Sequence, residues 1–79
     1  MLKGIAQQIN AETPIFAIVT DEHIHLQYGC FEFELGIEDN GDWTIYTEAF
    51  GVDIDSGKRV NNAVFKILDV IEEYCVSCY

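Results

Sequence analysis

Basic residues are scarce in this sequence. Residues 4–57 contain no lysine or arginine, and the whole chain has four such residues against 14 aspartates and glutamates, a formal net charge of −10. All but three of the acidic residues (Asp69, Glu72 and Glu73) lie in that same stretch. Such a surface repels the phosphates of DNA, RNA and anionic membranes. We therefore expect that the protein binds neither nucleic acid nor a membrane directly. The same charge attracts basic protein surfaces, although it also serves solubility.

Long hydrophobic runs are missing as well. The longest unbroken apolar run, Ile15 to Val19, is much shorter than the roughly 20 residues that cross a bilayer. The N-terminus lacks the apolar block and the small-residue cleavage site of a secretory signal peptide. Three cysteines, an odd number, do not suggest a disulfide framework, and reduced thiols are typical of the cytosol. We therefore expect a cytoplasmic protein.

Motifs that frame catalysis are also absent. The sequence has no glycine-rich phosphate loop and no framed Ser/His/Asp or Cys/His arrangement. Carboxylates are abundant, but a convex acidic face provides no cleft in which the pKa of one of them would be raised. The sequence predicts a protein without enzymatic activity and without a cofactor.

A β-hairpin is the clearest pattern in the chain. Apolar and polar residues alternate from Phe31 to Ile37 and again from Trp43 to Thr47, with the period of a half-buried strand. A two-residue turn at Asn40-Gly41 would mix the two faces. A three-residue loop over 39–41, with Gly41 in the left-handed conformation, sets Ile37 opposite Trp43. Because a one-residue slip moves every side chain to the other face, the hydrophobic match favours this loop.

The same loop places like charges across the hairpin. It sets Glu32 opposite Glu48, and Glu38 opposite Asp42, at a cost of a few tenths to about 1 kcal/mol. One interpretation is a solvated strand face, as most charged strand faces are, and the other is a surface kept acidic for a partner. We expect a partner-binding surface made of acidic residues and one tyrosine: Glu32, Glu34, Glu38, Asp39, Asp42, Tyr46, Glu48, Asp53 and Asp55.

Helices and two further strands are expected around the hairpin. The expected elements are a helix over residues 2–12, strands over 15–20 and 23–27, and a helix over about 57–76, with 49–56 as a connection. Two-residue turns at 21–22 and 28–29 would place His25 opposite Glu32, and His23 opposite Glu34. The prediction is one small α+β domain over residues 1–79. It is a four-stranded antiparallel meander in the order α-β-β-β-β-α, with the C-terminal helix packed on one face and a short N-terminal helix.

Two apolar residues are expected on the outer face of the first strand. Phe16 and Ile18 would be adjacent there, and a strand at the sheet edge also offers unpaired backbone groups. This favours a homodimer or a protein partner. If the N-terminal helix covered that face, the patch would disappear. A dimeric structural or adaptor subunit, whose acidity serves solubility alone, is therefore one alternative function.

His23 and His25 share one face of a strand. Together with Glu32 and Glu34 they make a plausible zinc geometry, so a metal-binding protein is a second alternative. Cross-strand His–Glu contacts that titrate together and bind nothing are the simpler interpretation. A flat exposed sheet lacks the dry pocket and supporting hydrogen bonds of most metal sites. We therefore expect no metal.

Cys75 and Cys78 have CxxC spacing near the C-terminus. Redox pairs of this type lie at helix N-termini, which lower the thiol pKa, whereas these two follow Glu72 and Glu73 at the end of a helix. Both continue the apolar stripe of that helix. We expect them to be buried structural cysteines.

The acidic residues that define the expected surface are Glu32, Glu34, Glu38, Asp39, Asp42, Glu48, Asp53 and Asp55. In surface charge, size and lack of a catalytic motif the chain resembles the small acidic inhibitors that phages and mobile elements carry, the anti-CRISPR and DNA-mimic proteins. The resemblance implies steric and electrostatic blocking of a DNA- or RNA-binding groove on another, basic protein. It also implies action without a cofactor, in the cytoplasm of a host cell.

Overall fold

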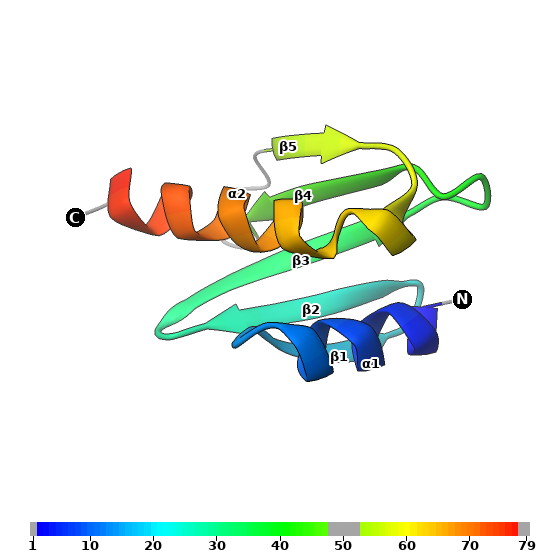
Figure 1. Cartoon of the computed structure of the whole chain (residues 1–79), viewed down its shortest axis with the longest axis horizontal. Helices are drawn as coiled ribbons and strands as arrows, with labels where there is room; N and C mark the ends of the chain where they lie inside the picture. The colour runs from blue at the N-terminus through cyan, green and yellow to red at the C-terminus, as the bar shows by residue number, and fades with distance from the viewer. Residues whose placement is uncertain (1, 48–52, 78–79) are drawn as a thin grey trace.

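The computed structural model describes residues 2–47 and 53–77. Its elements follow the chain in this order: α1 (Leu2–Glu12), β1 (Phe16–Thr20), β2 (His23–Tyr28), β3 (Phe31–Ile37), β4 (Trp43–Thr47), β5 (Asp53–Gly57), the 3₁₀ turn η1 (Val60–Asn62) and α2 (Val64–Ser77). The strands form one antiparallel sheet in the order β1-β2-β3-β4-β5. Both helices lie on the same side of this sheet (Figure 1).

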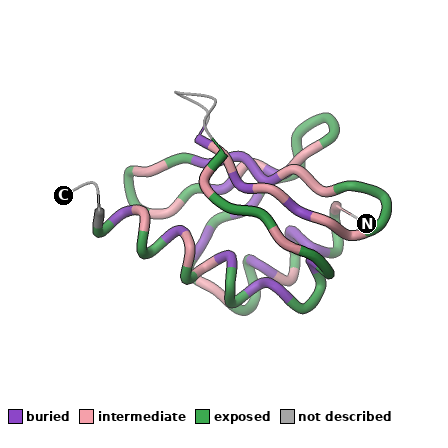
Figure 2. Tube along the Cα trace, turned by 90° about the horizontal axis from the view of Figure 1, so that it is seen from above, coloured by how far each residue is buried: buried purple, intermediate pink, exposed green. Residues whose placement is uncertain are grey.

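The hydrophobic core fills the space between the sheet and the two helices. Side chains alternate between the two faces of a strand, so alternate residues of β2, β3 and β4 join the apolar stripes of α1 and α2. Buried positions accordingly recur along both helices and strands in Figure 2. The buried residues of the core include Ile5, Ala6, Ile9, Ala17, Ile24, Leu26, Phe33, Leu35, Trp43, Ile45, Val64, Ile67, Ile71 and Cys75. The burial of Cys75 agrees with the structural interpretation of this cysteine, whereas Cys78 lies outside the described residues.

The predicted hairpin and its register are confirmed. Ile37 pairs with Trp43, Leu35 with Ile45 and Phe33 with Thr47. Gly41 has φ +90°, in the left-handed region. Its N–H donates to the carbonyl of Glu38 at 2.9 Å, and the N–H of Glu38 donates to the carbonyl of Asp42 at 2.8 Å. The expected pairing of Glu32 with Glu48 involves a residue outside the described ranges.

The α+β class, the antiparallel sheet and the two helices are confirmed, but the prediction of four strands was wrong. Residues 53–56 were expected in a connection and Gly57 at the start of the last helix, but residues 53–57 form β5 and pair with the free edge of β4. Ile54 is the one apolar residue of this strand, so the sequence has no alternating pattern that predicts the strand. Pairing with β4 outweighs its weak intrinsic preference. The last helix therefore begins at Val64, after η1, and not near Gly57 as expected.

The predicted register between β2 and β3 was also wrong, by two residues. The turn consists of Gly29 and Cys30, with Gly29 at φ +61°, and not of residues 28–29. His25 therefore pairs with Glu34, and His23 with Gly36. Moving a turn by one residue shifts the pairing by two, so every strand side chain keeps its predicted face. The turn at residues 21–22 and the register of β1 with β2 are as predicted.

Candidate functional site: the open face of the sheet

One face of the five-stranded sheet is not covered by either helix. We call this the open face. It carries the strand residues whose side chains point away from the core, namely Phe16, Ile18, Thr20, His23, His25, Gln27, Glu32, Glu34, Gly36, Thr44, Tyr46, Asp53 and Ser56. No lysine or arginine is among these described residues. The four basic residues lie on the helices and in the segment after β5: Lys3, Lys58, Arg59 and Lys66.

A row of paired residues crosses the middle of the open face. Ile18 pairs with His25, His25 with Glu34, Glu34 with Tyr46, and Tyr46 with Asp53. The row therefore runs from an apolar residue at the β1 edge to a carboxylate at the β5 edge. The strand registers bring these residues into one row.

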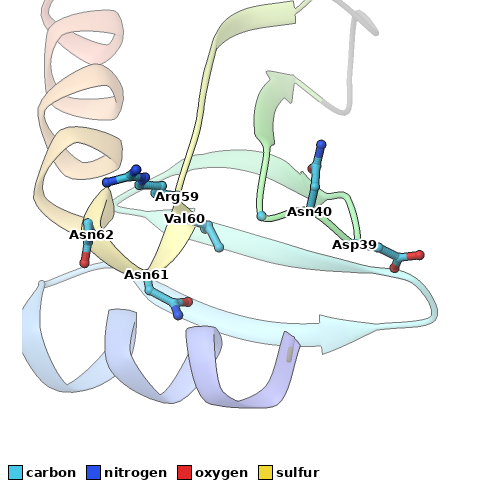
Figure 3. A pocket seen from close by; sticks show the side chains of 7 residues that line it. Asp39, Asn40, Arg59, Val60, Asn61 and Asn62 are labelled. Atoms are coloured by element: carbon cyan, nitrogen blue, oxygen red, sulfur yellow. The ribbon is translucent and has the colours of Figure 1, made fainter.

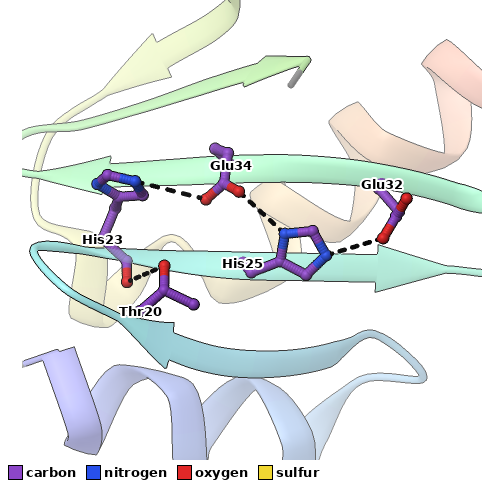
Figure 4. Close-up of polar contacts among 5 residues, drawn as sticks. All are labelled: Thr20, His23, His25, Glu32 and Glu34. Atoms are coloured by element: carbon purple, nitrogen blue, oxygen red, sulfur yellow. Dashed lines mark hydrogen bonds and ion pairs between the residues drawn. The ribbon is translucent and has the colours of Figure 1, made fainter. Parts of the chain in front are cut away.

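His25 lies between two carboxylates (Figure 4). Its Nδ1 is 2.9 Å from Oε1 of Glu34, and its Nε2 is 3.1 Å from Oε1 of Glu32. A neutral imidazole has a single N–H, so two carboxylate acceptors require the doubly protonated ring. The pKa of His25 is raised above 6.5, mainly by the hydrogen bond to Glu34, with burial acting in the opposite direction and Glu32 adding to the rise. The two carboxylates thus favour the cationic form of an imidazole on the acidic face.

Glu34 is buried although it belongs to the open face. Only 8% of its surface is exposed. One oxygen binds His25, while the other, Oε2, is 3.9 Å from Nε2 of His23 and has no hydrogen-bond partner among the described residues. Tyr46 lies beside it, with its ring over Gly36, where an added Cβ would be 3.9 Å from Cε1. Burial, followed by the charges of Glu34 and Asp53, raises the pKa of Tyr46.

The predicted zinc geometry is changed by the register. His23 faces Gly36 across the strands, and both ring nitrogens of His25 already meet carboxylates. Among the described residues, no group of three or more His, Cys, Asp or Glu side chains is placed to hold a metal ion. Hydrogen bonds and ion pairs connect the members of the His–Glu cluster.

Other predicted surface residues lie at one end of the sheet and not on the open face. Glu38, Asp39 and Asp42 belong to the β3–β4 loop. Asp21 and Glu22, in the β1–β2 turn, line a hollow together with Asp39 at this end of the sheet. Sequence reasoning missed this pair, although alternate turns of a meander return to the same end of the sheet and the strand count alone could have placed them together.

A bulge separates the two aspartates of β5. Asp53 pairs with Tyr46 and so belongs to the open face, whereas Asp55 pairs with Ile45, whose side chain is in the core. The register shift between these pairs leaves Ile54 as the extra residue. Asp55 therefore lies on the helix-covered side, at the exposed β5 edge. Glu48 lies outside the described residues.

Both sheet edges are partly closed by side chains. On β1 the N–H of Ala17 donates to Oδ1 of Asn10 at 2.7 Å, and Nδ2 of Asn10 donates to the carbonyl of Ala17 at 2.9 Å. On β5 the N–H of Ser56 donates to Oδ1 of Asp55 at 2.7 Å. Such contacts, together with edge charges and bulges, oppose pairing with another strand. The open face is therefore better suited than either edge to receive a partner.

Phe16 and Ile18 lie where the sequence placed them. They are exposed by 56% and 45%, on the open face of an edge strand. Because α1 packs on the opposite face, it leaves this apolar strip uncovered (Figure 1). The expectation of a dimer through this edge loses part of its basis, since Asn10 already binds the backbone of Ala17.

A polar hollow lies between the β3–β4 loop and η1 (Figure 3). It is lined by Asp39, Asn40, Gly41 and residues 59–62. The N–H of Val60 donates to the carbonyl of Gly41 at 3.0 Å, which ties the loop to η1. The exposed amides and charges of the hollow offer hydrogen bonds, and its described lining contains no Ser, Cys or His that could act as a nucleophile or a base.

Comparisons with known proteins were made at the level of family, sequence and fold. No family model, curated protein or solved structure matches this chain. None of the helices in the described part of the chain is long and apolar enough to cross a membrane. The geometry and charge of the open face are therefore the features that bear on function.

Proposed function

We propose that this protein is a non-enzymatic binding module whose open face docks on a basic surface of another protein. The observation that carries the proposal is that both helices leave this face uncovered and that its described residues include no lysine or arginine. The side chain of Glu32 is 58% exposed there, and Asp53 is exposed at the β5 side.

The charge of the open face and its exposed apolar strip both favour such a partner. A face that carries carboxylates and no lysine or arginine among its described residues accelerates encounter with a basic surface and disfavours acidic partners. Phe16 and Ile18 add an exposed apolar strip at the β1 side of the same face. Interfaces commonly combine an apolar area with polar surroundings. The partner we propose therefore presents arginines or lysines next to apolar side chains.

Basic surfaces of this kind often hold nucleic acid. Docking of the open face would occupy such a surface and exclude DNA or RNA from it, so the protein would act as an inhibitor without a cofactor. The cytoplasm, where nucleic-acid-binding proteins are abundant and thiols stay reduced, is the compartment that we propose. The acidic end formed by Glu38, Asp39 and Asp42 would extend the contact beyond the sheet.

A capture experiment tests this proposal. Immobilised wild type is compared with Glu32→Gln/Asp53→Asn, which removes two exposed charges from the open face, in a nucleic-acid-rich bacterial lysate. The matched control, Glu12→Gln/Asp69→Asn, removes two exposed charges from the helices. We expect wild type and control to retain the same nucleic-acid-binding protein, with release by salt, and the open-face variant to lose it.

A second step connects capture with inhibition. The captured protein, once purified, should lose its nucleic-acid binding as wild type is added and keep it with the open-face variant. Retention of the same partner by all three proteins, or capture that leaves nucleic-acid binding intact, would contradict the proposal.

A dimeric adaptor is the second candidate function, favoured by the exposure of Phe16 and Ile18. In that case analytical ultracentrifugation should show a dimer that Phe16→Ser/Ile18→Ser converts to a monomer. Removal of charge at Glu32 and Asp53 would leave the dimer unchanged. A wild-type protein that stays monomeric at high concentration contradicts this candidate.

A further inference from the structure

His25 occupies the two carboxylates that a basic partner would contact on the open face. The imidazole contacts Glu34 on one side and Glu32 on the other, at 2.9 and 3.1 Å. In the doubly protonated form it occupies the place that a partner's ammonium or guanidinium group would take. An arriving cation therefore meets both the attraction of the carboxylates and the repulsion of the imidazolium.

Glu34 supplies a second, independent indication of a cation site. Its Oε2 is buried, has no hydrogen-bond partner among the described residues and faces Nε2 of His23 at 3.9 Å. A buried carboxylate oxygen without a donor is costly. A cationic donor that displaces the exposed ring of His23 would satisfy it.

The surroundings of His25 contain few other titratable groups. Glu32 and Glu34 face it from β3, and His23 is its neighbour on the same face of β2. The paired residue on β1 is the uncharged Ile18, and Tyr46 of β4 lies beyond Glu34. The charged groups that His25 contacts in this cluster are Glu32 and Glu34.

We propose that the open face receives an arginine or lysine side chain of its partner at the carboxylates of Glu32 and Glu34, and that His25 releases its proton when that cation binds. This inference rests on the proposed function and adds its regulation. No covalent bond changes. One N–H proton of the imidazolium passes to the solvent as one positive charge enters, so the net charge of the cluster is conserved.

Proton release makes the affinity depend on pH. Below the pKa of His25, a partner whose binding displaces one proton should bind about tenfold more tightly for each unit of pH increase. Above that pKa the dependence should level off. The hydrogen bond to Glu34 raises the pKa of His25 above 6.5. The affinity should therefore continue to increase with pH from acidic values to beyond pH 6.5.

The protonation state is tested first, without any partner. Titration of the imidazole signals by NMR should show the pKa of His25 lower in Glu32→Gln than in wild type, and unchanged in the charge-matched control Asp69→Asn. If Glu32→Gln leaves the titration of His25 unchanged, the imidazole is not bound between the two carboxylates and the inference is wrong.

Binding is tested next, with a fluorescently labelled octa-arginine peptide at constant ionic strength between about pH 5.5 and 8.5. Wild type should show the pH slope, and His25→Gln should bind with nearly constant affinity. The matched variant His23→Gln should keep the slope, because only His25 contacts both carboxylates. Calorimetry in two buffers of different ionisation enthalpy should show up to about one proton released by wild type.

The possible results separate the inference from the proposed function. Peptide binding that depends on Glu32 but not on pH leaves the proposed function standing and overturns the inference. A slope that persists in His25→Gln, or disappears in His23→Gln, also overturns it. If wild type and Glu32→Gln/Asp53→Asn bind the peptide equally weakly at every pH, the proposed function fails and the inference fails with it.

Discussion

The carboxamide of Asn10 and the backbone of Ala17 form a closed pair of hydrogen bonds. The amide side chain accepts from the N–H at 2.7 Å and donates to the carbonyl at 2.9 Å. These are the contacts that a neighbouring strand would otherwise make with the outward side of β1. A helix side chain thus takes the place of a sixth strand.

Asn10→Ala should therefore destabilise the fold and free the edge. Loss of both bonds leaves two partly buried backbone groups without a partner, at a cost of about 1–3 kcal/mol. Urea unfolding measures the loss, and sedimentation detects self-association through the freed strand. Gln7→Ala, at an exposed site on the same helix, is the control and should change the unfolding midpoint little. Equal midpoints for the two variants would contradict the role of Asn10.

Gly57 is required by its contact with Trp43. A Cβ at this position would be 2.6 Å from Cζ2 of the indole, which is itself 1% exposed. We expect Gly57→Ala to lower the free energy of unfolding by about 1–3 kcal/mol. Gly4→Ala is the opposite case, since its Cβ would meet nothing within 4 Å and the residue lies in α1. That variant should gain up to about 1 kcal/mol, and chemical denaturation compares the two directly.

The stability of the protein should fall as the pH rises through the pKa of His25. The folded state raises this pKa above 6.5, first through the hydrogen bond to Glu34, so the folded state binds the proton more tightly than the unfolded chain does. The stabilisation is complete below 6.5 and is lost as the pH passes the folded-state pKa. Thermal unfolding between about pH 5 and 8.5 should show this loss in wild type and in His23→Gln. A profile for His25→Gln that falls as steeply would assign the effect to another group.

Tyr46 should make the fold sensitive to alkali. Burial is the main cause of its raised pKa, followed by the charges of Glu34 and Asp53. The fold therefore disfavours the phenolate. Its stabilisation is present below pH 10 and is lost as the pH rises through the folded-state pKa. Ultraviolet titration should show a late-ionising phenol in wild type that Tyr46→Phe removes. If Tyr46→Phe retains that transition, the late phenol is a different tyrosine, with Tyr28 beside Glu72 as the next to test.

The sequence predicted the strands whose side chains alternate and failed where they do not. The alternation from Phe31 to Ile37, together with Gly41, was sufficient to place Trp43 opposite Ile37. Residues 53–57 have no such pattern, and they form a strand only because β4 offers an unpaired edge. No propensity of the segment itself could reveal this.

The candidate site was predicted in composition but not in pairing. The face on which His23, His25, Glu32 and Glu34 lie followed from the alternation, whereas their partners depended on which two of residues 28–30 make the turn. Both choices keep the apolar residues inside, so hydrophobic matching cannot distinguish them. The burial of Glu34 also escaped prediction, because it results from the correct pairing with His25 and Tyr46.

The one-sided covering of the sheet has a consequence for synthesis of the chain. Each strand pairs with its neighbour in sequence, so successive hairpins can close over short distances and quickly. Phe33 packs against Tyr74 of α2, which follows the sheet in the chain and is translated after it. Until that helix has left the ribosome, the nascent sheet exposes the apolar residues that α2 covers, the state in which partly made chains aggregate or meet chaperones.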